Sequence, residues 1–170
     1  MERLHTLSLF VNLTRAELQI VDGLLHERNY LEGEVIFDEG EEGHAIYIIA
    51  SGEVLICRQG EADGGHPTPP GANVPAVSHP RRRQGDTGFV ARLGSGTFFG
   101  EMALLDNSPR SAQARAATPC QLIVFFRDDF VGLLDTHARI ASKISRQLAC
   151  HLGTRLRAMA LSMSAHQHLV

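Results

Sequence analysis

The chain has 170 residues, of which 44% are hydrophobic and 21% are charged, and its formal net charge at pH 7 is −3. This size allows one domain with its own core and a smaller appendage, while the slightly acidic balance excludes an overall basic field for nucleic acid. No apolar run is long enough to span a membrane, and the N-terminus lacks the apolar region of a signal peptide. We therefore expect a cytoplasmic segment that binds no nucleic acid and does not insert into a membrane, and that could be cut from a longer protein.

The cysteines and histidines form no recognisable metal or disulfide framework. Cys57, Cys120 and Cys150 are widely spaced and never form a C-x-x-C pair, which favours buried thiols in a reducing compartment. None of the nine histidines belongs to a helical H-E-x-x-H motif, and the closest pair is His166 and His168. We expect neither a metal site nor a cofactor.

A short amphipathic helix is predicted near the N-terminus. Thr14 and Glu17 have the spacing of a capping box, in which each side chain bonds to the other residue's backbone amide. Apolar residues follow at helical spacing: Leu18, Val21, Leu24 and Leu25. The pattern predicts that this helix runs to about His26.

From Tyr30 to about Cys57 the pattern changes to short β-rich runs separated by glycines. The runs are EVIFDEG, HAIYIIASGEV and LIC, and the glycines are Gly33, Gly40, Gly43 and Gly52. Strand character returns in GFVARLGSG and continues in SAQARAATPCQLIVFF. This rhythm is typical of a compact antiparallel barrel or jelly roll.

Residues 58–88 interrupt the β pattern. They contain five of the seven prolines, six glycines and the consecutive residues Arg81, Arg82 and Arg83. Such a segment cannot bury enough apolar surface to order itself, so we predict a long flexible loop between two strands. The three arginines are either a solvated part of this loop or a contact for a partner or an acidic ligand.

Two helices are predicted at the C-terminal end. Asp128 or Asp129 can cap a short helix that carries Phe130, Leu133 and Leu134. A longer helix follows His137. Its apolar stripe consists of Ile140, Ile144, Leu148, Leu152, Leu156, Met159 and Met163, and its opposite face carries Lys143, Arg146 and Arg157.

The length of this last helix bears on assembly. Because a small β domain can cover only part of the stripe, we expect the remainder to meet another helix, which predicts a homodimer through residues 139–163. The alternative is that the whole stripe packs on the β domain.

The stretch FGEMALLDNSPRSAQ, residues 99–113, places an acid and an arginine in an otherwise apolar run. EMALL can form one helical turn whose free amides suit an anion. Arg110 supplies a planar, charged fork for two phosphate oxygens, and Ser111 adds a neutral donor. Glu101 suits a sugar hydroxyl and a neighbouring arginine. These residues indicate either a nucleotide site or a surface turn with an incidental ion pair.

The same stretch closely resembles the phosphate-binding cassette of cyclic nucleotide-binding domains, which catabolite activator proteins, cyclic-nucleotide-dependent kinases and gated channels share. The family pattern is Phe-Gly-Glu, a small apolar helix, a short turn, Pro-Arg, a small residue and Ala. Its counterparts here are Phe99, Gly100, Glu101, residues 102–105, residues 106–108, Pro109, Arg110, Ser111 and Ala112. The upstream glycines and both flanking helices also match, so the resemblance covers about residues 4–157, with 58–88 as an insertion.

The resemblance implies a mainly β fold with flanking helices. We expect an antiparallel β-roll, or jelly-roll-like barrel, with an N-terminal helix, a short phosphate-cassette helix and a long C-terminal helix. Residues 1–136 would form the cyclic nucleotide-binding roll, and residues 137–170 the hinge and dimerisation helix.

The family pattern also implies roles for single residues. Arg110 would bind the exocyclic phosphate and Glu101 the ribose 2′-hydroxyl. Further ligand contacts would come from Gly100, Met102, Ala103, Ser111 and Ala112. Thr154 and Arg155 fall near the family's base contacts, where Arg155 is either a donor to guanine or a solvated arginine. Ser111 favours cyclic AMP, because catabolite activators carry Ser at this position whereas members that prefer cyclic GMP often carry Thr. The preference is narrow, because the Ser111 hydroxyl could also serve guanine.

A cyclic-nucleotide sensor without catalysis is the function that the resemblance implies. Its trailing helix would relay occupancy to a dimer partner or to an output domain in a longer protein. Within the same fold, the alternatives are a cyclic di-GMP-binding domain and a ligand-free interaction domain. A cupin-like metalloenzyme would need histidines clustered on inward strand positions, whereas the histidines here lie mostly in predicted loops and helices.

Overall fold

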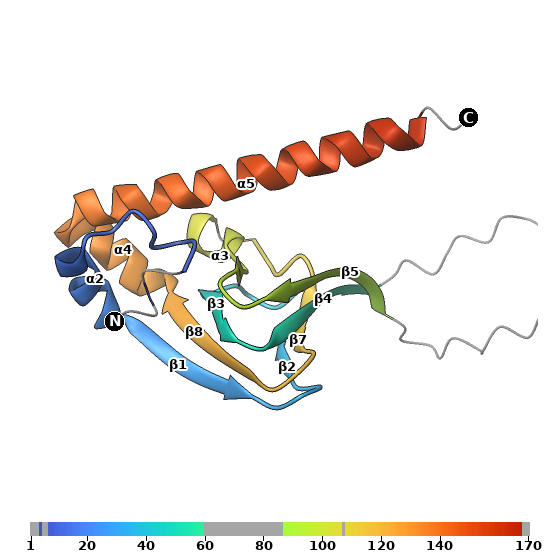
Figure 1. The fold of residues 1–170 in the computed structure, drawn as a ribbon, viewed down its shortest axis with the longest axis horizontal. Coiled ribbons are helices and arrows are strands. Elements are labelled where there is room, and N and C mark those ends of the chain that lie inside the picture. Colours follow the sequence, from blue (N-terminus) through green and yellow to red (C-terminus); the bar gives the residue numbers. More distant parts are fainter. Residues whose placement is uncertain (1–3, 5–6, 60–86, 107, 168–170) are drawn as a thin grey trace, which may run out of the picture.

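The computed structural model describes residues 4, 7–59, 87–106 and 108–167. Two four-stranded antiparallel sheets form a β-roll, and helices gather at one end of it (Figure 1). The first sheet has the order β1-β8-β3-β6, with bounds β1 (Leu25–Tyr30), β8 (Cys120–Phe126), β3 (Ala45–Ser51) and β6 (Phe98–Phe99). The second has the order β2-β7-β4-β5, with bounds β2 (Val35–Phe37), β7 (Gln113–Ala116), β4 (Glu53–Gln59) and β5 (Thr87–Gly94).

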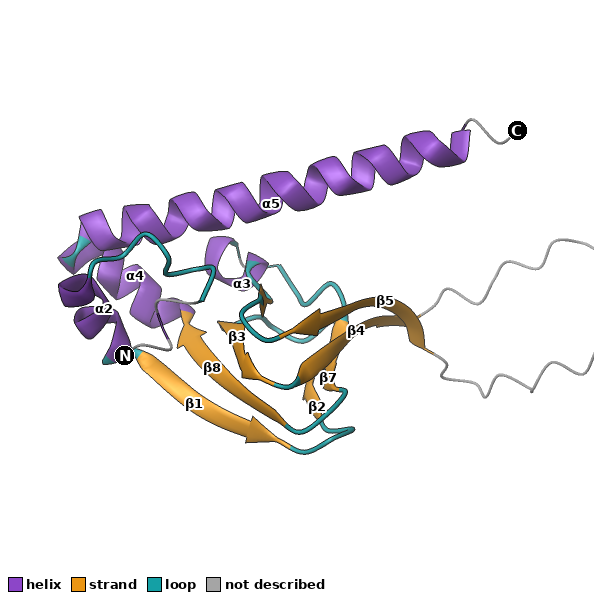
Figure 2. Ribbon diagram, in the orientation of Figure 1, coloured by secondary structure: helices purple, strands orange, loops and turns teal. Residues whose placement is uncertain are grey.

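This architecture confirms the predicted mainly β fold with flanking helices. The described helices are α2 (Arg15–Asp22), α3 (Met102–Leu105), α4 (Arg127–Thr136) and α5 (Ala138–Gln167). The described strands form two packed sheets rather than a closed barrel, so β-roll is the accurate description. In Figure 2, α3 lies apart from the helices at the end of the roll, in the connection between β6 and β7.

The β4–β5 pair carries the predicted insertion. The two strands are antiparallel neighbours, and their pairing continues to Arg58 with Gly88 and Gln59 with Thr87. The first two and last two residues of the predicted 58–88 loop are therefore strand residues. The rest of that segment, including Arg81, Arg82 and Arg83, lies outside the described residues.

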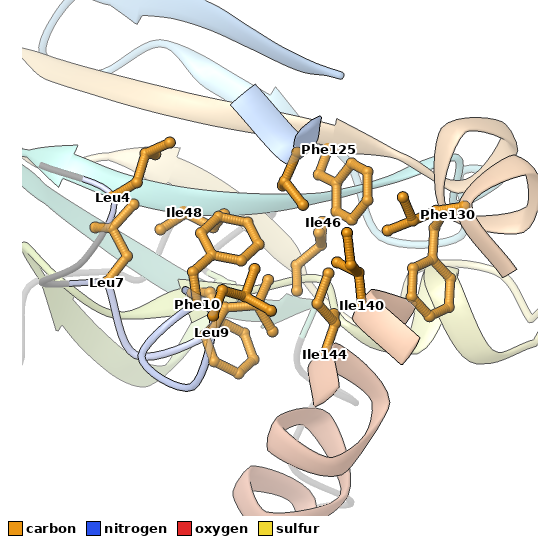
Figure 3. Close-up of a cluster of buried hydrophobic side chains, with 14 of the residues drawn as sticks. Leu4, Leu7, Leu9, Phe10, Ile46, Ile48, Phe125, Phe130, Ile140 and Ile144 are labelled. Carbon is orange, nitrogen blue, oxygen red and sulfur yellow. The ribbon is translucent and has the colours of Figure 1, made fainter. Parts of the chain in front are cut away.

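Two clusters of buried apolar side chains hold the roll together. One lies between the two sheets and includes Phe37, Ile49 and Phe99. The other joins the first sheet to the helical end, where side chains from α4 and α5 point toward the sheet residues Ile46 and Phe125 (Figure 3). Burying apolar surface stabilises a fold by about 25 cal/mol per Å². The second cluster, which contains Ile140, Ile144 and Leu148, is therefore the main attachment of α5 to the roll.

The predicted start of the N-terminal helix is confirmed, but the helix is shorter than predicted. Thr14 and Glu17 form the reciprocal capping box. The helix ends at Asp22 rather than near His26, because residues 25–30 pair along their whole length with β8. The sequence of β1, LHERNY, shows no apolar alternation, so strand pairing outweighs a weak local preference there.

The expected cap of α4 is wrong. Its N-cap residue is Phe126, which makes no side-chain cap bond, and Asp128 and Asp129 both lie in the first helical turn. Because the helix begins one residue before Asp128, the two carboxylates favour it through its dipole rather than as a cap, and Oδ2 of Asp129 also lies 4.0 Å from Nε2 of His26. Leu133 is buried as expected, whereas Leu134 is 43% exposed.

Helix α5 is one continuous element of 30 residues, about 45 Å long. Its apolar stripe is buried at Ile140, Ile144 and Leu148, but Leu156 is 69% exposed. The side chains of Met159 and Met163 lie outside the described part of the structure. On the opposite face, Lys143 bonds to Glu17 of α2 through both carboxylate oxygens, at 2.8 and 2.6 Å. The roll thus covers only the N-terminal part of the stripe.

None of the helices in the described ranges carries an apolar stretch long enough to cross a membrane.

Candidate ligand-binding site

The segment that leads from β6 to β7 folds as the predicted short turn. Gly100, with φ of +74°, ends β6, and Glu101 is the N-cap residue of α3. The helix has four residues and ends at Asp106. Arg110 then bonds back to the loop before β3, where its amide donates to the Glu41 carbonyl at 2.7 Å. The cassette is thereby fastened to a loop that is distant in sequence.

Arg110 is a buried cation without an anionic partner. The residue is 8% exposed, its Nη1 donates to the Gly100 carbonyl at 3.1 Å, and its Nη2 donates to the Ala45 carbonyl at 2.9 Å. Its Nε is buried without a hydrogen-bond partner, and no carboxylate of the described residues forms an ion pair with it. Burial lowers the pKa of Arg110, while Tyr47 and the more distant carboxylates of Glu41 and Glu101 act to raise it. An unneutralised charge with an unused donor fits an anion such as phosphate.

Two glycines make room for this arginine. A Cβ atom on Gly100 would lie 2.6 Å from Arg110 Nη1. A Cβ atom on Gly43 would lie 2.8 Å from the Ala103 Cβ and 3.5 Å from Arg110 Cζ. The guanidinium therefore packs directly against the backbone of the cassette and of the loop before β3. Positive φ at Gly100 adds a conformational reason for glycine there.

Glu101 is buried and paired with a residue of α5. It is 2% exposed, and its Oε1 accepts a hydrogen bond from Arg155 Nη1 at 2.5 Å. This bond supplies the arginine expected beside Glu101. It also gives Arg155 a protein partner, while the arginine side chain remains 56% exposed. In Figure 1, α5 runs above α3, and the bond between Arg155 and Glu101 joins α5 to the start of α3.

His151 joins the same junction without having been predicted. Its ring packs on Phe98 of β6, with the two centroids 4.3 Å apart. Burial lowers the pKa of His151, Glu101 acts to raise it, and Arg155 acts to lower it further. This part of α5 therefore meets the cassette through one aromatic contact and one ion pair.

The other predicted site residues differ in exposure and in bonding. Ala103 is buried, Met102 is 46% exposed, Ser111 is exposed and Ala112 is intermediate. The Ser111 carbonyl accepts a hydrogen bond from Arg58 Nε at 3.2 Å. The Thr154 hydroxyl donates to the Cys150 carbonyl within α5 at 3.0 Å, so that donor is already used.

Sequence reasoning missed the surroundings of Arg110. The rings of Phe37 and Tyr47 lie against its guanidinium, and Ala45 supplies one of its acceptors. These residues belong to β2 and β3, far from the cassette in sequence, and buried aromatic strand residues usually indicate only a core.

No three side chains of His, Cys, Asp or Glu come together as metal ligands within the described ranges.

Comparison with known proteins shows which family the chain resembles. Residues 78–137 match the family model of the cyclic nucleotide-binding domain. The chain is 32% identical to the cyclic AMP receptor protein of Thermus thermophilus over 91% of its own length and 60% of that protein. It is 30% identical to the cAMP-dependent protein kinase regulatory subunit of Mycosarcoma maydis over 64% of its length and 16% of that subunit. The crystal structure of the Thermus thermophilus catabolite activator protein matches with a TM-score of 0.72 and 30% identity, covering 94% of this chain and 63% of that one.

The fold and the comparisons together define a ligand-binding regulatory domain. The chain belongs to the cyclic nucleotide-binding superfamily, as the cassette resemblance predicted. It spans 60% of the receptor protein's length and a smaller share of the kinase subunit.

Proposed function

We propose that this chain is a cytoplasmic sensor domain that binds one cyclic mononucleotide and catalyses no reaction. The observation that carries the proposal is Arg110, a buried guanidinium with no carboxylate partner and an unpaired Nε. Leaving such a charge uncompensated is costly, so the site is best explained as a receptor for an anion that arrives with the ligand.

The ligand's sugar and phosphate follow from the cassette. Arg110 binds the exocyclic phosphate, and Glu101 accepts a hydrogen bond from the ribose 2′-hydroxyl. Glu101 has two oxygens and Arg155 engages Oε1, so a hydroxyl can either share the carboxylate or displace the arginine. Additional contacts are assigned to Gly100, Met102, Ala103, Ser111 and Ala112.

Cyclic AMP is the favoured ligand, with cyclic GMP next. Ser111 stands directly after the cassette arginine, where its exposed hydroxyl can meet either base, which keeps cyclic GMP close behind. The receptor protein and the kinase regulatory subunit described above, both named for cyclic AMP, support this order, and a relative named as a cGMP-dependent protein kinase keeps cyclic GMP as the second candidate. If ligand binding releases Arg155 from Glu101, its guanidinium becomes available to cap the base, with Thr154 beside it.

Helix α5 is the proposed relay. Arg155 connects it directly to the cassette, so a ligand that engages Glu101 changes a contact that holds the helix. Such a differential contact is what a ligand needs in order to shift a two-state equilibrium. Leu156 and Leu161, which are 69% and 73% exposed, extend the apolar surface beyond the roll and suit the partner helix of a homodimer. A domain outside this chain would supply the output.

Calorimetric titration with cyclic AMP, cyclic GMP and cyclic di-GMP tests the proposal. We expect binding of one mononucleotide per chain, with cyclic AMP the tighter. Binding of cyclic di-GMP alone would favour the dinucleotide alternative. Absence of heat and of any spectral change with both mononucleotides, in folded protein, would contradict the proposed function.

A further inference from the structure

Two aromatic rings from different sheets lie against the cassette arginine. Arg110 Cζ is 4.1 Å from the ring centroid of Phe37 and 5.6 Å from that of Tyr47. The two rings are 5.5 Å apart, and Tyr47 stacks on Phe99 with centroids 5.4 Å apart and an interplanar angle of 12°. Phe37 belongs to β2 and Tyr47 to β3, so the guanidinium lies between residues from both sheets.

These rings allow the Arg110 charge to be buried without a carboxylate beside it. A carboxylate beside Arg110 would compensate its buried charge but would also repel a phosphate and compete for its N–H groups. The face of an aromatic ring attracts a cation within about 6 Å, carries no net charge and uses no hydrogen-bond donor. This holds fully for Phe37, whereas the hydroxyl of Tyr47 also interacts with the guanidinium as a hydrogen-bond partner. The guanidinium can therefore be buried as a cation while its remaining donors stay available.

The hydrogen bonds of Arg110 fit the same arrangement. Nη1 and Nη2 each donate to a backbone carbonyl, which fixes the side chain at its end. One of these carbonyls belongs to Ala45, two residues before Tyr47 on β3, so a single strand supplies both an acceptor and a ring. Nε is left as the buried donor without a partner.

We propose that Phe37 and Tyr47 are positioning residues of the anion site, which hold the Arg110 guanidinium in place and leave Nε for a ligand oxygen. Phe37 has the larger role because its ring is closer. That the anion is a nucleotide phosphate rests on the proposed function. The contact of the two rings with Arg110 is independent of it.

The first test needs no nucleotide. In ligand-free protein labelled with ¹⁵N, the Arg110 Nε–H resonance should shift when Phe37→Leu removes the ring current. Phe125→Leu, which alters a buried ring in the other apolar cluster, serves as the control and should leave the resonance unchanged. Titration with inorganic phosphate should move the resonance in wild type and move it less in Phe37→Leu. The same Arg110 resonance in wild type and Phe37→Leu would overturn the inference, whatever the ligand proves to be.

The second test measures affinity for cyclic AMP. Phe37→Leu should weaken binding about 3- to 30-fold, the range for an exposed to a desolvated cation–π contact, and Tyr47→Leu should weaken it less. In a variant that already carries Arg110→Lys, Phe37→Leu should weaken cyclic AMP binding by less than about twofold further, because the Phe37 ring acts through the guanidinium. Phe37→Met replaces Phe37→Leu if that variant does not fold. Unchanged affinity in folded variants lacking either ring would overturn the inference, whereas a wild type that binds no cyclic nucleotide would refute only the proposed function.

Discussion

Arg155, on α5, donates from Nη1 to Oε1 of Glu101 at the start of α3, across 54 positions of sequence. The carboxylate side chain is 3% exposed, while the arginine side chain is 56% exposed. One partner is therefore fixed within the cassette and the other lies on a helix that solvent can reach. This asymmetry makes Arg155 the partner that can leave.

Removing Arg155 should loosen α5. Arg155→Met leaves a buried carboxylate without its cation, which costs about 1–3 kcal/mol, and the exposure of the arginine places the expected value near the lower end. Hydrogen exchange of the α5 amides around residues 150–160 should accelerate in Arg155→Met. Arg157→Met is the matched control, because Arg157 is exposed and its side chain donates a hydrogen bond to Thr154 of its own helix, at 3.4 Å. Equal protection of α5 in wild type and Arg155→Met would contradict the coupling of helix and cassette.

A methyl group at position 100 should damage the site. Gly100→Ala combines an unfavourable positive φ with a Cβ atom 2.6 Å from Arg110 Nη1. We expect a loss of about 1–3 kcal/mol in the free energy of unfolding and at least a tenfold loss of cyclic nucleotide affinity, on the order of 1.4 kcal/mol. Gly94→Ala meets no heavy atom within 4 Å and should change neither quantity. Chemical denaturation and calorimetry measure the two effects, and an unaltered affinity in Gly100→Ala would show that the Arg110 position is not critical.

An acid on the exposed part of α5 should prevent dimerisation. Leu156→Glu places a charge on the apolar stripe beyond the roll, where we expect the partner helix. Leu31→Glu is a matched control, because Leu31 is also 69% exposed but lies between β1 and β2. Sedimentation velocity should give dimers for wild type and Leu31→Glu and monomers for Leu156→Glu. A monomeric wild type with and without cyclic AMP would rule out the proposed assembly.

Acid should weaken the attachment of α5 to α2. The Lys143 ammonium, followed by the Thr14 amide, lowers the pKa of Glu17 from 4.5 to about 2. Since the folded pKa lies below the unfolded one, the stabilisation is present above pH 4.5 and is lost as the pH falls from about 4.5 toward 2.

Charge removal at Lys143 tests this pH dependence. The pair is partly exposed, so we expect Lys143→Met to lose under about 1 kcal/mol at pH 7 and to show a smaller decline in stability between pH 5 and pH 3. Lys143→Arg retains the positive charge and should follow wild type. Urea denaturation at each pH measures the effect, and parallel pH profiles for wild type and Lys143→Met would contradict the assigned cause.

Local chemistry made part of this protein predictable from its sequence. The cassette from Phe99 to Ala112 is contiguous, so its turn, its acid and its arginine could be recognised together. The capping box of Thr14 and Glu17 is likewise contained in four residues. Elements of this kind depend on neighbours in the chain, and both formed as expected.

Other features depend on pairing that spacing does not encode. Strand β1 has a polar sequence and forms because β8 offers a complete set of backbone partners. Phe37 and Tyr47 reach Arg110 only after two sheets have packed, and Arg155 reaches Glu101 only because α5 remains helical past the roll. These contacts join segments far apart in sequence, so local spacing could not show which residues would meet.

Calorimetric titration of Arg110→Ala with cyclic AMP is the most direct test of the central claim, that a buried arginine receives the ligand's phosphate. Arg92→Ala is the control, since Arg92 is an exposed arginine of the same roll that pairs with Glu53 at 3.1 Å. We predict that wild type and Arg92→Ala bind with equal affinity and that folded Arg110→Ala binds at least about 100-fold more weakly, equivalent to about 2.7 kcal/mol. Wild-type affinity in folded Arg110→Ala would contradict the claim.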